Sequence, residues 1–122
     1  MGVGGEKTVL VVDDDPSLRL LCRVNLELDG YAVVEACSSA EALAALAASC
    51  VDAMVCDLHL GGEDARDLLA TLGDKAPPVA IFTGSEMLSP ELLATAQIVL
   101  PKPFALDDLR NTVDRLVAMP RV

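Results

Sequence analysis

The sequence predicts an α/β fold in which one parallel sheet carries helices on both of its faces. Five short apolar runs alternate with helical patterns along the 122 residues, as in successive right-handed βαβ units. The runs are apolar throughout instead of alternating with polar residues, which is typical of strands buried on both faces. No internal repeat and no linker interrupts the pattern. We therefore expect a single domain over residues 1–122, with a core at about 7–118 and flexible ends.

The apolar runs give the predicted strands in order, and the first helix follows the first of them. The helix begins at Pro16, which suits a first helical turn, and ends before Gly30. Its inward stripe consists of Leu18, Leu21, Cys22 and Leu26. The strands are Thr8–Val12, Ala32–Ala36, Ala53–Cys56, Val79–Thr83 and Ile98–Leu100.

The second and third helices have clear start or stop signals. Ser38 or Ser39 caps the second helix, whose inward residues are predicted to be Ala40, Leu43, Ala44 and Ala47. The third helix runs from about Asp64 to Leu72 and stops at Gly73. Its inward residues are Leu68, Leu69 and Leu72.

Two more helices complete the pattern. A short fourth helix starts near Pro90. The last helix has an apolar stripe at helical spacing that consists of Leu106, Leu109, Val113, Leu116 and Val117.

The first helix has a second apolar row, at Leu20, Val24 and Leu28. One interpretation is a broad buried face. The other is a surface on which a helical partner docks. The sequence leaves both open.

Charge and composition exclude several classes of function. A net charge of −10, a pI near 4.3 and only three aromatic residues argue against nucleic-acid binding. No apolar run approaches the ~18 residues that a membrane span needs. The N-terminal residues lack the features of a signal peptide. We expect a cytoplasmic protein without membrane insertion.

The cysteines show no CxxC spacing that would indicate a metal site or a redox motif. They are Cys22, Cys37, Cys50 and Cys56. We expect buried, reduced thiols, as suits a cytoplasmic core.

Polar residues follow four of the five predicted strands. Asp13 and Asp14 end the first strand, Asp57 ends the third, Thr83 ends the fourth, and Lys102 follows the fifth. In an open parallel sheet these strand ends meet at one edge, where ligands bind. Three acids, one hydroxyl and one ammonium group should therefore lie together.

This set of groups has a chemical logic. Clustered carboxylates raise one another's pKa unless a cation neutralises them, and short oxygen ligands suit Mg²⁺. Asp57 can then act as a nucleophile toward a phosphoryl group, while Thr83 and Lys102 stabilise the charge on its oxygens. Asp15 has a simpler role, because it precedes Pro16 and suits a helix N-cap.

Four motifs together carry a family resemblance: "VVDDDPSLR", "VCDLHL", "FTG" and "PKPF". Each stands at a strand end, and their order is specific. Over roughly residues 7 to 118 the chain resembles a receiver domain of two-component response regulators. The resemblance implies a flavodoxin-like, doubly wound sheet of five parallel strands in the order 2-1-3-4-5. It implies a phosphoacceptor, not an enzyme that turns over a separate substrate.

The resemblance also implies roles for single residues. Asp57 would be the phosphoacceptor, taking phosphate from a phosphohistidine of a sensor histidine kinase or a histidine phosphotransfer domain. Thr83 and Lys102 would grip the phosphoryl group, and the Lys102–Pro103 peptide would be cis. An output domain or a partner protein would receive the signal, and a kinase's helix bundle would dock beside the first helix.

The implied cofactor is Mg²⁺. Asp14 would bind it directly, Asp13 largely through water, and Asp57 and the backbone carbonyl of His59 would complete the ligand set. The side chain of His59 is expected to lie in a loop near the mouth of the site. His59 and Ser85 occupy the two positions at which the family tunes phosphate lifetime.

The sequence departs from the family pattern in three places. The loop after Asp57 reads "GGEDA", with Gly61 and Ala65 in place of the family's proline and Asp-Gly turn, and the glycines add flexibility to the backbone. Val99 replaces the aromatic residue that swings with the hydroxyl in many members. The stretch from Thr83 to Lys102 is short, which trims the fourth helix.

Two alternative functions follow from these features. A phosphohydrolase with an aspartyl-phosphate intermediate would want an acid where this chain has His59. A pseudo-receiver that binds partners without phosphorylation agrees with Val99 and the short helix, while the complete set of acids and Lys102 argue against it.

Overall fold

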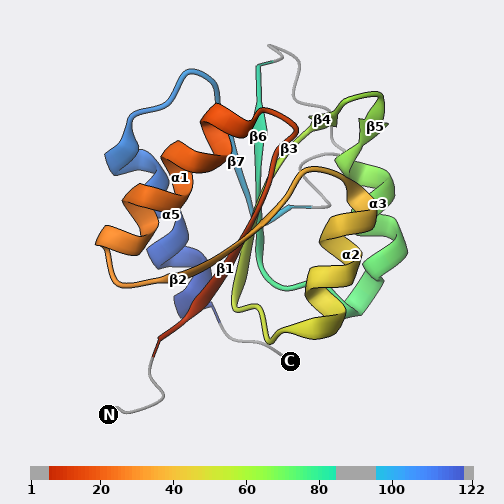
Figure 1. The fold of residues 1–122 in the computed structure, drawn as a ribbon, viewed down its shortest axis with the longest axis horizontal. Helices are drawn as coiled ribbons and strands as arrows, with labels where there is room; N and C mark the ends of the chain where they lie inside the picture. Colours follow the sequence, from red (N-terminus) through yellow and green to blue (C-terminus); the bar gives the residue numbers. More distant parts are fainter. Residues whose placement is uncertain (1–5, 85–95, 120–122) are drawn as a thin grey trace.

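A five-stranded parallel sheet forms the centre of the computed structural model, which describes residues 6–84 and 96–119 (Figure 1). The strands lie in the order β2-β1-β3-β6-β7, which is the predicted order 2-1-3-4-5. They are β1 (Thr8–Val12), β2 (Ala32–Ala36), β3 (Ala53–Asp57), β6 (Val79–Thr83) and β7 (Ile98–Pro101).

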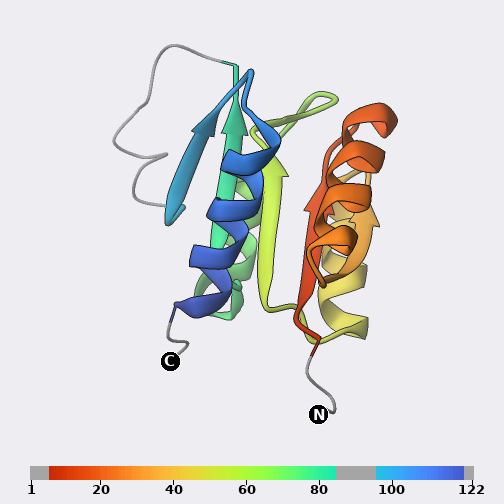
Figure 2. The ribbon, with the colours of Figure 1, turned by 90° about the vertical axis from the view of Figure 1, so that its left-hand side faces the viewer.

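Helices cover both faces of this sheet, as predicted. Helices α1 (Pro16–Leu28) and α5 (Leu106–Ala118) lie on one face, and α2 (Ser39–Ala48) and α3 (Ala65–Leu72) on the other (Figures 1 and 2). A 3-10 turn, η1 (Gly73–Lys75), follows α3. The helix predicted near Pro90 lies outside the described residues, and so does Ser85.

The core has two halves because side chains alternate between the faces of each strand. Leu10 and Val12 of β1 pack toward α2 and α3. Val9 and Val11 pack toward α1 and α5. The four side chains are fully buried, which explains why the strand reads as a continuous apolar run.

Side-chain caps fix where three helices begin. Asp15 caps α1, and its Oδ1 accepts from the backbone N–H of Ser17 at 2.9 Å. Ser38 caps α2, and Asp64 caps α3. Each side chain satisfies an N–H group that the helix itself leaves without a partner.

The predicted inward faces of α1 and α2 need correction. Leu21 is 46% exposed, and Leu20, Val24 and Leu28 are also exposed, so the interpretation as a broad buried face is wrong. In α2 the buried residue is Ala42, and Leu43 is partly buried. The predicted residues Ala40, Ala44 and Ala47 are exposed. The prediction failed because alanine and leucine occur on all sides of this helix, so the sequence does not indicate which side faces the core.

The cysteine prediction is half right. Cys22 and Cys56 are buried, but Cys37 and Cys50 are exposed, and all four are free. Cys37 and Cys50 lie in connections at the surface, where burial is not available. None of the helices in residues 6–84 and 96–119 is long and apolar enough to cross a membrane.

Candidate functional site

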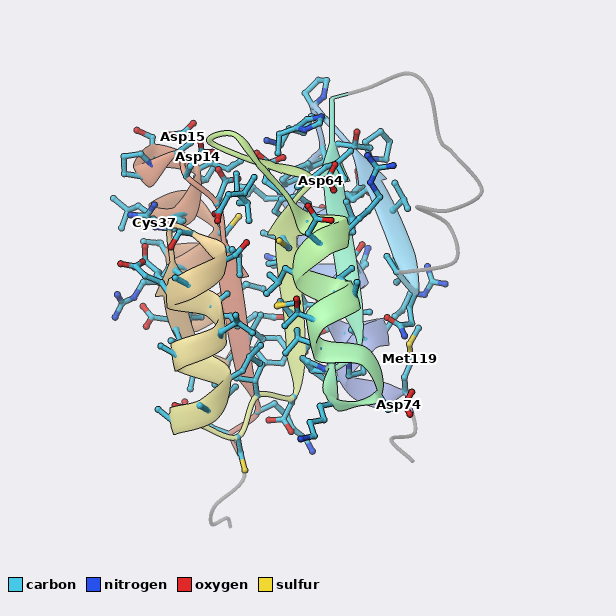
Figure 3. All side chains as sticks on the ribbon, turned by 90° about the vertical axis from the view of Figure 1, so that its right-hand side faces the viewer. Asp14, Asp15, Cys37, Asp64, Asp74 and Met119 are labelled. Carbon is cyan, nitrogen blue, oxygen red and sulfur yellow. The ribbon has the colours of Figure 1, made fainter. Side chains whose placement is uncertain are left out.

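The topology brings the predicted residues to one edge of the sheet. Strands β1, β3, β6 and β7 are consecutive neighbours, and Val12 pairs with Cys56, Asp57 with Phe82, and Thr83 with Pro101. The residues at or just beyond these strand ends are therefore adjacent. Figure 3 shows Asp14 and Asp15 at this end of the molecule, far from Asp74 and Met119.

Three carboxylates form a cluster at this edge. One oxygen from each of Asp13, Asp14 and Asp57 lies within 4.8 Å of the other two. The Nζ atom of Lys102 lies 3.3 Å from Oδ1 of Asp57 and 3.9 Å from Oδ2 of Asp13. The ammonium group thus approaches two of the three acids.

The acids differ in exposure. Asp13 is fully buried, Asp57 is partly buried and Asp14 is exposed. Burial raises the pKa of Asp13, and the nearby Asp57 charge raises it further, while the Asp15 N–H and Lys102 oppose these effects. The cluster therefore contains one carboxylate that is costly to keep charged.

The buried carboxylate of Asp13 is only partly satisfied. Its Oδ1 accepts a hydrogen bond from the N–H of Asp15 at 2.8 Å. Its Oδ2 is buried and has no hydrogen-bond partner, although Lys102 lies nearby. A buried carboxylate oxygen without a partner, beside two other acids, fits a hard divalent cation that prefers oxygen ligands.

Thr83 and Lys102 are held against each other through the backbone. Thr83 is 1% exposed at the end of β6, and its carbonyl oxygen accepts a hydrogen bond from the N–H of Lys102 at 2.7 Å. The Lys102–Pro103 peptide is cis, as expected. The hydroxyl and the ammonium group therefore come from two adjacent, linked segments.

The segment after Asp57 forms a short hairpin, a conformation that the sequence did not indicate. Strands β4 (His59–Leu60) and β5 (Glu63–Asp64) pair antiparallel. The two residues between them, Gly61 and Gly62, both have positive φ, 57° and 99°. Two positive φ angles suit a type I′ turn, which favours glycine and matches the twist of a two-residue hairpin.

The hairpin has contacts on two sides. Oε1 of Glu63 accepts from the N–H of Ser39, at the start of α2, at 3.1 Å. His59 begins β4 and is exposed, so it lies in a short strand and not in the loop that was predicted. Residue 61 lies beside Asp14, since a Cβ atom there would stand 3.3 Å from Oδ2 of Asp14.

Val99 lies in β7 opposite Ile81 and is partly buried against the core on the α2–α3 side.

Sequence reasoning missed two residues that contact the acids, although it noted Gly61 as a departure from the family pattern. One is Arg19, whose Nη1 donates to the backbone carbonyl of Asp13 at 2.7 Å. The other is Gly61. The only sequence signal for Arg19 is its place one turn into the helix after Asp15, and that place alone does not indicate the contact.

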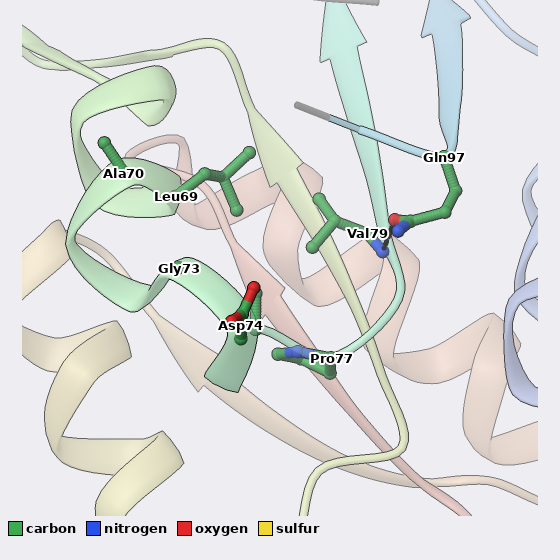
Figure 4. A pocket seen from close by; sticks show the side chains of 8 residues that line it. Leu69, Ala70, Gly73, Asp74, Pro77, Val79 and Gln97 are labelled. Atoms are coloured by element: carbon green, nitrogen blue, oxygen red, sulfur yellow. Dashed lines mark hydrogen bonds between the residues drawn. The ribbon is translucent and has the colours of Figure 1, made fainter. Parts of the chain in front are cut away.

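An apolar groove of about 380 Å³ opens beside Lys102. Its other lining residues come from α1, from the segment between β7 and α5, and from the first residue of α5, and they are Leu18, Leu21, Pro103, Phe104 and Leu106. A second hollow, shown in Figure 4, lies between α3 and the start of β6, away from the acids, and there Oε1 of Gln97 accepts from the N–H of Val79 at 2.7 Å.

Comparison with known sequences gives a consistent result. A family model described as "Response regulator receiver domain" matches residues 9–114. The chain is 37% identical over 111 residues to the transcriptional regulatory protein GlrR of Escherichia coli, covering 87% of this chain and 25% of GlrR. It is 38% identical over 108 residues to the response regulator MprA of Mycobacterium tuberculosis, covering 83% of this chain and 46% of MprA. The chain thus spans less than half of either relative.

Solved structures agree with the fold. The chemotaxis protein CheY4 of Vibrio cholerae is 28% identical, with a TM-score of 0.82 and coverage of 92% of this chain and 99% of CheY4. The response regulator TrrA of Thermotoga maritima, solved in complex with Mg(2+)-BeF, is 26% identical, with a TM-score of 0.81 and coverage of 90% and 98%.

Proposed function

The chain belongs to the response regulator receiver family, and from that premise we propose that it accepts a phosphoryl group on Asp57 in two-component signal transduction. The observation that carries the proposal is the position of Asp57, partly exposed at a strand end with Nζ of Lys102 3.3 Å from its Oδ1. A carboxylate that is accessible and faces a cation can reach an incoming phosphoryl group while its developing charge is balanced.

Mg²⁺ is the proposed cofactor. Asp14 and Asp57 would bind it directly, Asp13 largely through water, and the backbone carbonyl of His59 would add a further oxygen. The buried, unpartnered Oδ2 of Asp13 supports this set of ligands. When bound, Mg²⁺ would offset part of the negative charge of the acids and of the phosphoryl oxygens, which would reduce the repulsion between nucleophile and substrate.

In the proposed reaction, a phosphoryl group moves from a histidine nitrogen of the donor to Asp57. A carboxylate oxygen of Asp57 forms a bond to phosphorus as the bond from phosphorus to the donor's histidine nitrogen breaks. The electron pair of that bond stays on the imidazole, which takes up a proton from solvent. Thr83 and Lys102 bind the oxygens of the transferred group, because a hydroxyl donor and an ammonium group stabilise the charge on them. The chain itself is the acceptor, so it turns over no separate substrate.

The phosphodonor would be a sensor histidine kinase or a histidine phosphotransfer protein in the cytoplasm, and it would dock on the apolar groove beside Lys102. Leu21, which lines this groove, is one of four exposed large apolar residues on α1, and the others are Leu20, Val24 and Leu28. An apolar helix face next to the acceptor suits a helical donor that must present its phosphohistidine at Asp57. Signal output would pass to another domain or protein, and the net charge of −10 disfavours direct contact of this chain with nucleic acid.

The experiment that tests the proposal is intact-mass measurement after incubation with Mg²⁺ and acetyl phosphate. We expect one phosphoryl adduct in the parent, none in Asp57→Asn, and none when Mg²⁺ is chelated. Asp74→Asn is the control, because Asp74 is exposed at the other end of the molecule (Figure 3). An adduct on Asp57→Asn would contradict the assignment. Failure of the parent to bind Mg²⁺ and to accept phosphate from a histidine donor would favour a pseudo-receiver.

A further inference from the structure

Arg19 connects the acidic strand end to the neighbouring strand. Its Nη1 donates to the backbone carbonyl of Asp13 at 2.7 Å, and its Nε donates to Oε1 of Glu35 at 3.1 Å. The side chain of Arg19 is 19% exposed and that of Glu35 is 24% exposed. Both contacts are therefore shielded from water better than an ordinary surface pair.

With this contact, Asp13 is held at three of its four polar groups. Its N–H donates to the carbonyl of Ala36 at 3.0 Å, and its Oδ1 accepts from the N–H of Asp15 at 2.8 Å. Arg19 holds the carbonyl oxygen. Oδ2 is the remaining group, and it is the buried atom without a hydrogen-bond partner beside the other acids.

The carbonyl that Arg19 holds belongs to the peptide that joins Asp13 to Asp14. A peptide unit is planar, so a hydrogen bond to its oxygen fixes the orientation of the whole plane. That plane determines where the Cα atoms of both acids lie and in which directions their side chains leave the backbone. Arg19 can therefore influence both carboxylates without touching either.

We infer that Arg19 is a positioning residue that orients the Asp13–Asp14 peptide, so that both acids are arranged for the cation before it binds. The inference rests on the proposed function, because that function supplies the cation. It goes beyond it in assigning a role to a residue outside the ligand set.

Arginine suits this task better than lysine does. The guanidinium group presents several N–H donors in a rigid plane, and here two of them contact partners on different segments. Glu35 is itself fixed from the other side, since Nη1 of Arg23 lies 2.9 Å from its Oε2. The carboxylate of Glu35 thus anchors the guanidinium group that holds the Asp13 carbonyl.

Arg23 provides a matched control. Arg19→Gln and Arg23→Gln each remove one ion pair with Glu35, but only Arg19 contacts the acidic strand end. Two readouts apply to both variants. One is the set of amide NMR resonances of residues 13–15 in the metal-free protein. The other is Mg²⁺ affinity measured by titration calorimetry.

We expect Arg19→Gln to shift the amide resonances of residues 13–15 and to weaken Mg²⁺ binding by about tenfold, the lower end of the range for outer-shell groups at metal sites. Arg23→Gln should leave these resonances in place and Mg²⁺ affinity within about twofold. Arg19→Lys retains one ammonium donor and should recover part of the lost affinity. It also provides a second variant if Arg19→Gln folds poorly.

Two results would overturn the positioning role. One is unchanged resonances of residues 13–15 in Arg19→Gln, and the other is an equal loss of Mg²⁺ affinity in Arg19→Gln and Arg23→Gln. A parent protein that binds no Mg²⁺ would overturn the proposed function instead. The metal-free NMR comparison would still decide whether Arg19 orients the peptide.

Discussion

A Cβ atom on Gly61 would lie 3.3 Å from Oδ2 of Asp14, so the tip of the β4–β5 hairpin closely approaches the exposed acid of the site. The adjacent Gly62 has a positive φ as well, but a Cβ atom there would meet nothing within 4 Å. The two glycines therefore share a backbone requirement and differ in their distance from Asp14.

This difference predicts distinct effects for two alanine substitutions. Gly61→Ala and Gly62→Ala should each lower the free energy of unfolding by about 1–2 kcal/mol, because alanine resists a positive φ. Only Gly61→Ala should also weaken Mg²⁺ binding, since its methyl group pushes against Asp14. Urea unfolding and titration calorimetry measure the two effects. Equal Mg²⁺ affinities in the two variants would show that the contact with Asp14 does not matter.

Asp13→Asn should stabilise the metal-free protein at neutral pH. The pKa of Asp13 is raised, chiefly by burial and also by the Asp57 charge, so the folded state holds the charged form at a disadvantage. Stability linked to this group is present below the ordinary pKa of 3.8 and is lost as the pH rises through the folded-state pKa. Asparagine carries no charge, so this loss of stability does not occur in Asp13→Asn. Its amide oxygen can still accept the hydrogen bond from the N–H of Asp15.

Urea midpoints without Mg²⁺ at pH 7 test this expectation, with Asp74→Asn as a control for the overall change in charge. Saturating Mg²⁺ should reverse the order, because the parent gains more from the cation. A lower midpoint for Asp13→Asn than for the parent, both without metal, would contradict the account of the cluster.

Glu35 gives the opposite pH dependence. The hydrogen bond from Arg23, assisted by Arg19, lowers the pKa of Glu35. The stability it contributes is therefore present above its ordinary pKa of 4.5 and is lost as the pH falls through the lower folded-state value. Glu35→Gln should cost about 0.5–1 kcal/mol at pH 7, a size typical of partly exposed ion pairs. The gap between the urea midpoints of the parent and Glu35→Gln should close as the pH falls below 4.5, and a gap that persists undiminished would refute the linkage.

We expect a substitution in the apolar groove to change the rate of phosphorylation by a protein donor but not by a small-molecule donor. Leu21→Ala should slow phosphorylation by a histidine phosphotransfer donor and leave acetyl phosphate labelling unchanged, because Leu21 lines the groove but lies outside the acid cluster. Leu28→Ala is the control, since Leu28 is 80% exposed near the far end of α1. Both variants should keep the parental stability to within about 0.5 kcal/mol, as exposed substitutions usually do. Rate constants from both donors, measured side by side, decide whether the groove contributes to docking.

The strands could be predicted from the sequence because burial on both faces leaves a strong signal, whereas their order came from the family resemblance. The continuous apolar run of β1 is an example, and the polar residues that follow the strands lie together as the parallel topology requires. The cap at Asp15 was also predicted, and for the cap of α2 the sequence indicates Ser38 or Ser39, of which Ser38 is the one observed, since local hydrogen bonds determine such caps. The cap at Asp64 was not predicted, because the sequence pattern makes Asp64 the first residue of the helix itself.

Features that depend on packing between distant segments could not be predicted in this way. Contact with the sheet determines which face of α2 points inward, and the many alanines of this helix do not indicate that face in the sequence. The β4–β5 hairpin contains only two residue pairs, His59 with Asp64 and Leu60 with Glu63. Strands this short leave no recognisable pattern in the sequence. The contact from Arg19 to Asp13 joins a helix to a backbone carbonyl, a group that every residue carries, so no residue type signals it.

The site takes its parts from four strand ends that span the sequence from Asp13 to Lys102. Protein synthesis proceeds from the N-terminus, so a nascent chain cannot complete this site until Lys102 has left the ribosome and β7 has joined the sheet. A chain that ends between Asp57 and Lys102 would carry Asp57 without the ammonium group of Lys102. On the proposed function, such incomplete chains would lack the ammonium group that balances the charge on the transferred phosphoryl group.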